Sequence, residues 1–187
     1  MADDEKKLEG RYNSSLTDIG ISQAQETLCE FRELGYLFDA ILTSPLSRAL
    51  KTAEIINIGY GVPLISDDIL MERDNGVLAG LVRAEADLKY PINHKITPLT
   101  KYPNQSGENL VVLHSRALAA LDFILQRRPG QYLVVSHGNF LNALVRVILG
   151  VPIPLNNSGC FFSFRDNGFI EFEYHENDHK WIMRRLI

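Results

Sequence analysis

Residues 131–139 read Gln-Tyr-Leu-Val-Val-Ser-His-Gly-Asn, and this stretch indicates the fold class of the chain. Its nearly continuous apolar run is typical of a strand that is buried on both faces of a parallel sheet. The run ends in a polar turn, and residues 140–149 have the pattern of a helix. Because a strand followed at once by a helix is the unit of α/β folds, we expect helices to cover a parallel sheet.

The same alternation of strand and helix extends on both sides of this stretch. Apolar runs predict further strands at residues 38–43 and 62–65. Periodic patterns predict helices over residues 17–34, 44–58, 82–89 and 108–127. The first has Thr17 as its N-cap, and the second begins at Ser44-Pro45. We therefore expect a three-layer α/β fold with a mostly parallel sheet, followed by a hairpin over residues 160–174 and a last edge strand near 181–186.

Length and composition are ordinary and exclude several classes of protein. The chain has 187 residues, which suits a single domain over residues 1–187. Its net charge of −4 argues against a nucleic-acid partner, since such proteins usually carry a basic patch. No apolar run is long enough to span a membrane, and the start has no pattern of a signal peptide. Two cysteines without metal or redox spacing favour a cytoplasmic protein.

Arg48 is the first candidate for binding an anion. It lies in the first turn of a predicted helix that directly follows a strand, beside the positive end of the helix dipole. A guanidinium there suits a phosphate or carboxylate, which it binds with two parallel hydrogen bonds. The alternative is a surface arginine paired with Glu54 or Asp39.

His137, Gly138 and Asn139 form the second candidate group, at the end of the strand predicted to be most buried. Ligands of parallel sheets bind at the carboxyl ends of the strands. The charge of His137 is adjustable near neutral pH, Gly138 allows a ligand close to the backbone, and Asn139 adds a donor. The alternative is a histidine that is hydrogen-bonded within a turn.

Glu72 is a candidate general acid. It lies with Arg73 between the apolar residues 69–71 and a glycine-containing turn, which favours a partly buried carboxyl group. A glutamate–arginine pair on a surface loop is the commoner explanation of such a motif taken alone.

Five motifs in order together resemble the histidine phosphatases, also called the phosphoglycerate-mutase-like superfamily. Each motif alone is weak, but their order and spacing along most of the chain are specific. They are the loop and helix start at residues 9–20 followed by Gln23-Ala24, the arginine motif at 44–52, Glu72-Arg73, Ser-Gly-Glu-Asn-Leu at 106–110 and Ser-His-Gly-Asn at 136–139.

The resemblance implies a reaction and its catalytic residues. A histidine at the end of the first strand attacks a phosphomonoester and becomes phosphohistidine. Arg48 and His137 neutralise the transferred oxygens, and Glu72 protonates the leaving group and then activates water. Gly138, Asn139, Glu9 and Gly10 help to hold phosphate and substrate. The expected partner is a small phosphorylated substrate, and no metal or other cofactor is expected.

One element of the family pattern is not in the sequence. The family carries its nucleophile in an Arg-His-Gly motif, and these 187 residues contain no Arg-His-Gly. The family spacing puts that histidine about thirteen residues before Gly10, or about three residues before Met1. We therefore expect a chain truncated before its first strand, with the motif encoded directly upstream and little turnover by the chain as given.

Three alternatives to a phosphatase remain at this point. The first is a phosphoglycerate mutase, although the short stretch between Arg73 and Gly107 favours a phosphatase, because the cofactor-dependent mutases carry a longer insertion there. The second is a non-catalytic domain that keeps Arg48, Glu72 and His137 as an anion pocket for a ligand or partner. The third is a purely structural domain. Since the first strand lies inside the sheet of the family, its loss also predicts exposed sheet edges and a homo-oligomer formed through them.

Overall fold

The computed structural model describes residues 7–91, 97–100, 106–153, 161–163 and 165–187. Its longer helices are α1 (Asp18–Glu33), α2 (Ser47–Asn57), α3 (Arg83–Lys89), α4 (Leu110–Leu125) and α5 (Gly138–Ile148). Its strands are β1 (Ala40–Thr43), β2 (Leu64–Ser66), β3 (Tyr132–Val135), β4 (Ile170–His175) and β5 (Lys180–Leu186). Short 3₁₀ turns are η1 (Asp68–Leu70), η2 (Gly76–Leu78) and η4 (Glu176–Asp178).

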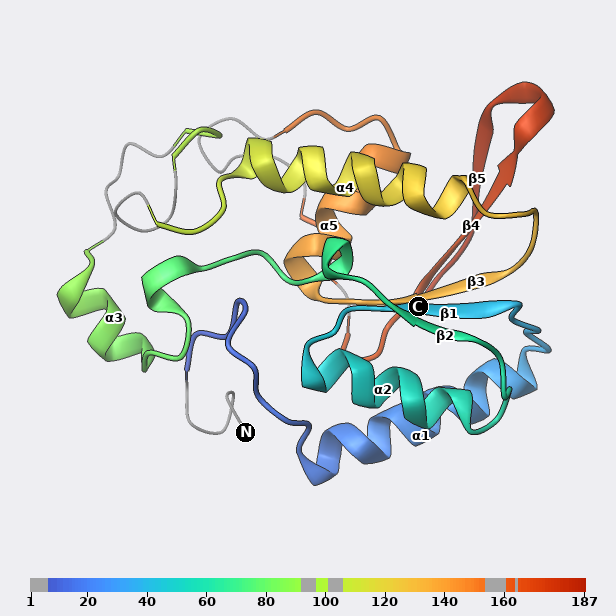
Figure 1. Cartoon of the computed structure of the whole chain (residues 1–187), viewed down its shortest axis with the longest axis horizontal. Coiled ribbons are helices and arrows are strands. Elements are labelled where there is room, and N and C mark those ends of the chain that lie inside the picture. Colours follow the sequence, from blue (N-terminus) through green and yellow to red (C-terminus); the bar gives the residue numbers. More distant parts are fainter. Residues whose placement is uncertain (1–6, 92–96, 101–105, 154–160, 164) are drawn as a thin grey trace.

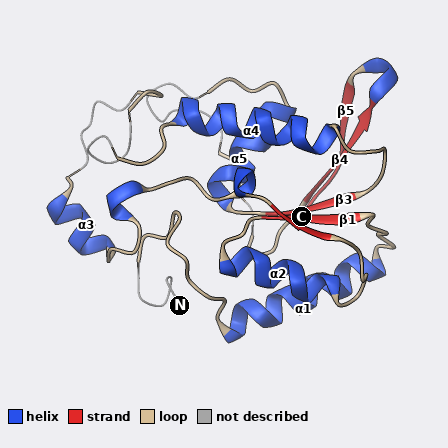
Figure 2. Ribbon diagram, viewed as in Figure 1, coloured by secondary structure: helices blue, strands red, loops and turns tan. Residues whose placement is uncertain are grey.

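The centre of the fold is a parallel sheet in the order β2-β1-β3. Helices α1 and α2 cover one face of this sheet and α4 and α5 cover the other (Figure 1). Figure 2 shows the same three layers by secondary structure, with the β4–β5 hairpin projecting to one side. The prediction of a three-layer α/β fold with a parallel sheet is confirmed.

Strand β1 is the most buried strand because it has a partner on both sides and helices on both faces. All four of its residues are buried. Leu42 belongs to a core with α4 and α5, whereas Ile41 belongs to a core with α1 and α2. Successive strand residues point to opposite faces, so one short apolar strand supplies both cores.

Helix boundaries follow local capping. The side chain of Thr17 accepts a hydrogen bond from the backbone N–H of Gly20, which starts α1 as predicted. Helix α2 starts at Ser47, after the predicted Ser44-Pro45, because Ser44 belongs to the end of the strand segment. Within the described residues, no helix combines the length and apolarity needed to cross a membrane.

Strand β3 differs from its prediction. Its residues Tyr132–Val135 are half-buried, not fully buried on both faces. In the described part of the chain β3 pairs with β1 alone, so its second edge has no strand beside it. Strand β3 is therefore less buried than predicted because it lies at the edge of the described sheet.

The C-terminal hairpin also differs from its prediction. Asn167 lies in a turn, as expected, but residues 161–163 form no strand, and residues 154–160 and 164 lie outside the described residues. The hairpin consists of β4 and β5, an antiparallel pair that turns at Glu176–Asp178. The predicted edge strand near residues 181–186 is thus the second half of the hairpin.

Aromatic side chains attach the hairpin to the body of the protein. The ring of Phe169 packs edge-on against Phe31 and Tyr36, with centroid distances of 4.9 and 6.0 Å. The Tyr36 hydroxyl donates a 2.6 Å hydrogen bond to Glu171 in β4. Burial and the neighbouring Glu171 raise the pKa of Tyr36 to about 12. These contacts lie at the amino end of β1, away from the candidate site.

Candidate active site at the carboxyl ends of the strands

The register of the sheet brings His137 beside Ser44. Strands β1 and β3 end level with each other, with Thr43 opposite Val135. The backbone N–H of Ser44 then donates a 3.0 Å hydrogen bond to the carbonyl of Val135. Beyond this pair, one residue further in the first segment and two residues further in the second, Nε2 of His137 lies 2.8 Å from Oγ of Ser44.

His137 is a buried, neutral imidazole. Its exposed fraction is 8%. Burial, and then the positive charges of Arg48 and Arg116, lower the pKa of His137 to about 3. Both effects disfavour a second proton, because charge is costly in a buried site and more so near other cations. The ring therefore acts as a hydrogen-bonding group at neutral pH and not as a cation.

Arg48 clamps the N-terminal loop against α2. Its Nη2 and Nη1 groups donate hydrogen bonds of 2.8 and 2.9 Å to the carbonyls of Gly10 and Tyr12. Its Nε lies 3.4 Å from the carboxylate of Glu9. These contacts use three of the five N–H groups of the guanidinium and leave two for a ligand.

The surface pairings considered for Arg48 do not occur. Glu54 pairs with Lys51 at 3.2 Å, and Asp39 pairs with Arg128 at 3.0 Å. Arg48 instead faces the end of the sheet, as its anion-binding interpretation requires.

The loop around Gly10 fits closely between α2 and the segment after β2. Asn13 accepts a 2.7 Å hydrogen bond from the backbone N–H of Ser47, so it caps α2 from outside the helix. Gly10 has a φ of 51°, and a Cβ there would lie 2.7 Å from Cβ of Asn75. Only glycine adopts this positive φ without strain and leaves room for Asn75 without a shift of the neighbouring chain.

Glu72 lies at the N-terminus of α5, not on the surface. It is 7% exposed. One carboxylate oxygen accepts from the backbone N–H groups of Arg73 (2.7 Å) and Phe140 (3.1 Å). The other accepts from the backbone and side-chain N–H groups of Asn139 at 3.3 and 3.4 Å. The carboxylate thus satisfies free N–H groups in the first turn of the helix.

Arg116 in α4 fixes the backbone that carries Glu72. It donates hydrogen bonds to three backbone carbonyls, those of Ile69 (3.0 Å), Met71 (2.6 Å) and Glu72 (3.3 Å). Two further bonds, of 2.9 and 2.7 Å, join its guanidinium to both carboxylate oxygens of Glu108. Glu108 is buried and the Arg116 side chain is 14% exposed. The ring of Phe140 lies under the Arg116 cation at 4.8 Å.

Gly138 leaves open space at the start of α5. A Cβ at this position would meet no atom within 4 Å. Gly138 follows His137 and precedes Asn139, so its backbone N–H lies at the same helix start that already holds Glu72. This is the place where a ligand oxygen can approach the backbone, as the sequence interpretation of Gly138 requires.

The structure brings all the predicted site residues to one end of the sheet. Sequence reasoning missed the roles of Ser44, Glu108 and Arg116. Ser44 and Glu108 stood inside recognised motifs, whereas Arg116 did not. Glu108 lies just before Asn109, the N-cap of α4, and Arg116 lies within the helix, so the short spacing of two opposite charges is the signal that could have paired them.

A hollow lies on the outer surface of α1, and its lining does not share the chemistry of the sheet end. Its volume is about 550 Å³, and it contains three glutamates and one arginine, so its charge opposes an anionic ligand; its lining is Ser22, Gln25, Glu26, Cys29, Glu30, Glu33 and Arg165. Within the described ranges, no group of three or more His, Cys, Asp or Glu side chains could hold a metal ion. The end of the sheet is therefore the candidate site.

Comparisons with known proteins agree on one protein family. The sequence pattern of the histidine phosphatase superfamily (branch 1) matches residues 2–180. The uncharacterized phosphatase PhoE of Bacillus subtilis is 35% identical over 181 residues, which is 96% of this chain and 85% of that protein. The probable phosphoglycerate mutase GpmB of Cronobacter sakazakii is 35% identical over 154 residues, 79% of this chain and 69% of that protein.

Solved structures share the fold. YhfR of Bacillus stearothermophilus superposes with a TM-score of 0.82 and 26% identity, covering 97% of this chain and 89% of that one. A mycobacterial glucosyl-3-phosphoglycerate phosphatase in complex with VO3 superposes with a TM-score of 0.81 at 19% identity, covering 97% and 91%. The α/β architecture found here is thus that of the phosphoglycerate-mutase-like histidine phosphatases.

We expect loss of the Glu108–Arg116 pair to destabilise the protein strongly. The E108Q variant leaves the Arg116 cation buried without its counter-ion, which typically costs about 3–5 kcal/mol in the free energy of unfolding. Urea unfolding of wild type, E108Q, R116M and the double variant measures this cost. As a control, E85Q removes an exposed i,i+4 pair with Lys89 and should change the free energy by under about 0.5 kcal/mol. Equal effects of E108Q and E85Q would contradict this account of the pair.

Burial of neutral His137 predicts a specific loss of stability in acid. The pKa of His137 is about 3 in the folded protein, whereas an ordinary histidine side chain has a pKa of 6.5, so the unfolded chain binds one proton more between these pH values. The stabilisation is therefore complete above pH 6.5 and is lost as the pH falls toward 3, with a slope of up to about 1.4 kcal/mol per pH unit. Urea unfolding of wild type and H137Q from pH 8 to about 4 should show the steeper decline in the wild type. Parallel curves would show that His137 is not buried in its neutral form.

Proposed function

Because the chain belongs to the histidine phosphatase superfamily, we propose that it derives from a metal-independent phosphomonoesterase and binds the phosphoryl group of a small phosphorylated substrate at the end of its sheet. The observation that carries this proposal is the convergence of Arg48, His137 and Glu72 beside the open backbone of Gly138. We take residues 1–187 as one histidine-phosphatase-like domain.

Two sets of groups would hold the phosphoryl oxygens. Arg48 has two N–H groups left after its contacts with the loop, and the helix start adds the N–H of Gly138. His137 adds a neutral ring that donates or accepts a hydrogen bond without adding charge. Glu9 is itself an anion, so it acts by holding Arg48, and Gly10 acts by supplying the carbonyl that orients the guanidinium.

Glu72 is the residue that we assign to proton transfer. Its carboxylate lies at the same helix start and is held by Asn139 and by the backbone of Phe140. In the family reaction such a group protonates the leaving oxygen and then deprotonates water. Asn139 is a positioning residue in this proposal, because its contacts are with Glu72.

The nucleophile of the family reaction is not among the residues of this site. The chain has five histidines, at positions 94, 114, 137, 175 and 179. His114 lies in α4, and His175 and His179 lie in the hairpin, whereas His94 is outside the described residues. His137 already fills the second position of the family pattern. We propose that the chain as given binds phosphate but turns over phosphomonoesters slowly or not at all, as a pseudo-phosphatase would.

We favour a phosphatase lineage over a mutase lineage. The phosphatase-named relative matches 96% of this chain, whereas the mutase-named relatives match 74–79%. The stretch between Arg73 and Gly107 is also short for a cofactor-dependent mutase.

The first test is binding of inorganic phosphate by isothermal titration calorimetry. We expect wild type to bind and R48Q to bind at least about tenfold more weakly, because a charge-assisted hydrogen bond contributes about 1.5–3 kcal/mol. R128Q, which removes an exposed cation from the Asp39 pair, serves as the control and should bind like wild type. In parallel, hydrolysis of several phosphomonoesters should remain near the uncatalysed rate.

Each part of this proposal, phosphate binding and slow hydrolysis, has a result that would contradict it. Phosphate binding that is equal in wild type and R48Q would support the purely structural alternative. Rapid hydrolysis by the 187-residue chain would show that it carries a nucleophile that the sequence comparison did not identify.

The free edge of β3 leads to a second prediction. A half-buried apolar strand favours association with another chain if one of its edges is unpaired, as that of β3 is among the described residues. We expect a homo-oligomer through this edge, measured by size-exclusion chromatography with light scattering. Dilution should shift the protein toward the monomer, because association depends on protein concentration. A monomer at all concentrations in the wild type would contradict this proposal.

A further inference from the structure

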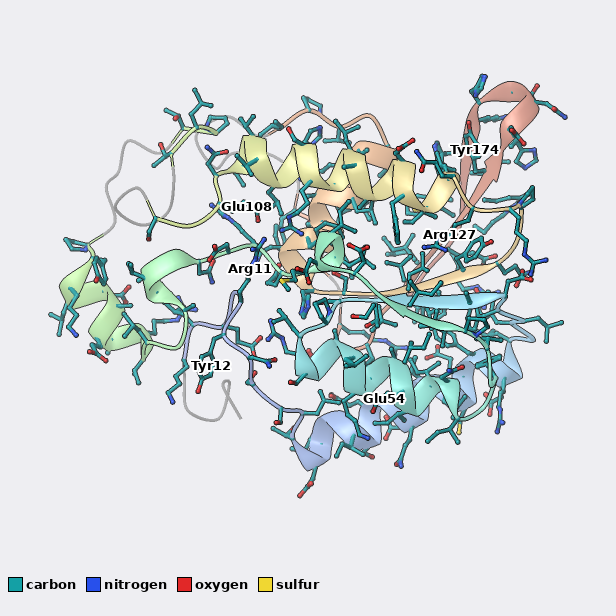
Figure 3. All side chains as sticks on the ribbon, in the orientation of Figure 1. Arg11, Tyr12, Glu54, Glu108, Arg127 and Tyr174 are labelled. Atoms are coloured by element: carbon teal, nitrogen blue, oxygen red, sulfur yellow. The ribbon has the colours of Figure 1, made fainter. Side chains whose placement is uncertain are left out.

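Two arginines approach the same carbonyl oxygen beside the candidate site. Nε of Arg11 donates a 3.3 Å hydrogen bond to the carbonyl of Glu72, and Nη2 of Arg116 donates another of 3.3 Å to the same atom. Figure 3 shows Arg11 extending from the N-terminal loop toward the segment that carries Glu108. Arg11 thus lies at the edge of the site, next to the backbone of the residue that we assign to proton transfer.

The positive charges near the site differ in how they are neutralised. Arg116 is paired with Glu108, and Arg48 is paired with Glu9. Arg11 has no carboxylate partner within the described part of the chain; its contact there is with the Glu72 carbonyl. A guanidinium without such a carboxylate partner, close to the Arg116 cation, lowers the free energy of an anion that binds next to it.

The contact of Arg11 with Glu72 also orients its remaining donors. Nε is occupied by the Glu72 carbonyl, so the two Nη groups lie at the far side of the planar guanidinium and have no partner among the described residues. These donors match the two oxygens of a carboxylate or phosphate group. Because Gly10, the residue before Arg11, is held by Arg48, the Arg11 side chain starts next to the proposed phosphate site.

We propose that Arg11 binds a second anionic group of the substrate, so that the site selects phosphomonoesters that also carry a carboxylate or a second phosphate. This inference rests on the proposed phosphate site and adds the substrate class to it. Arg48 and Gly138 bind the phosphoryl group that is transferred, whereas Arg11 binds the group that stays with the alcohol.

The competing explanation is that Arg11 only supports the backbone of Glu72. In that case its loss would weaken all phosphate ligands alike, since it would disturb the site as a whole. A direct contact weakens only those ligands that carry the second anion. Pairs of ligands that differ in one charged group therefore separate the two explanations.

The test uses two matched pairs of ligands that differ in spacer length. The first pair is 3-phosphoglycerate and glycerol 3-phosphate, and the second is 6-phosphogluconate and glucose 6-phosphate. Dissociation constants for these four ligands and for inorganic phosphate are measured by titration calorimetry with wild type, R11Q and the control R128Q. Since binding is measured, the test does not depend on turnover.

In the wild type, we expect the acidic member of at least one pair to bind about tenfold or more tightly than its neutral match. R11Q should reduce this preference to about twofold or less, while its affinity for inorganic phosphate changes by about threefold or less. R128Q should keep the wild-type preference.

Three outcomes would overturn the inference. If wild type binds inorganic phosphate but prefers neither acidic ligand, the second anion has no subsite. If R11Q keeps the preference, or loses affinity for all five ligands equally, Arg11 does not contact the second anion. If inorganic phosphate does not bind to wild type at all, the proposed function fails, and the substrate class fails with it.

Discussion

The parallel pairing of β1 with β3 is the constraint on which the rest of the site depends. It sets Thr43 opposite Val135, and just beyond this pair the side chains of Ser44 and His137 meet. The helices that follow these strands begin at the same level, so Arg48 in the first turn of α2 and the free N–H groups of α5 face one region. A shift of one residue in this pairing would separate Ser44 from His137 and turn the side chains of the strand to opposite faces.

Arg48, Arg116 and the start of α5 each have a carboxylate beside them. Each of two buried or half-buried arginines has its own glutamate, and a third glutamate occupies the start of α5, while His137 stays neutral. The protein therefore holds several ionic groups in a small volume without a large net field. Such an arrangement positions backbone and side chains. It leaves the binding of an anion to the few donors at Gly138, Arg48 and Arg11 that have no partner in the described part of the chain.

Much of this arrangement can be predicted from the sequence, because strand ends, helix starts and capping residues are local features. Arg48, Glu72 and His137 could be recognised in this way, as could the capping of α1 by Thr17. The half-burial of β3 and the hairpin of β4 with β5 could not, since they depend on which strands become neighbours in space. The contacts of Arg116 with three carbonyls 44 to 47 residues away are likewise a property of the packed structure alone.

The hairpin of β4 and β5 has a consequence for engineering of the chain. Phe169, Tyr36 and Glu171 attach it to the amino end of β1, and its turn at Glu176–Asp178 projects away from the sheet (Figure 2). The turn is exposed and lies on the opposite side of the protein from Arg48 and His137. Exposed turns of this kind tolerate inserted residues. The hairpin turn is therefore a suitable place for an affinity tag, a fluorophore or a surface tether that leaves the ligand-binding end of the sheet accessible.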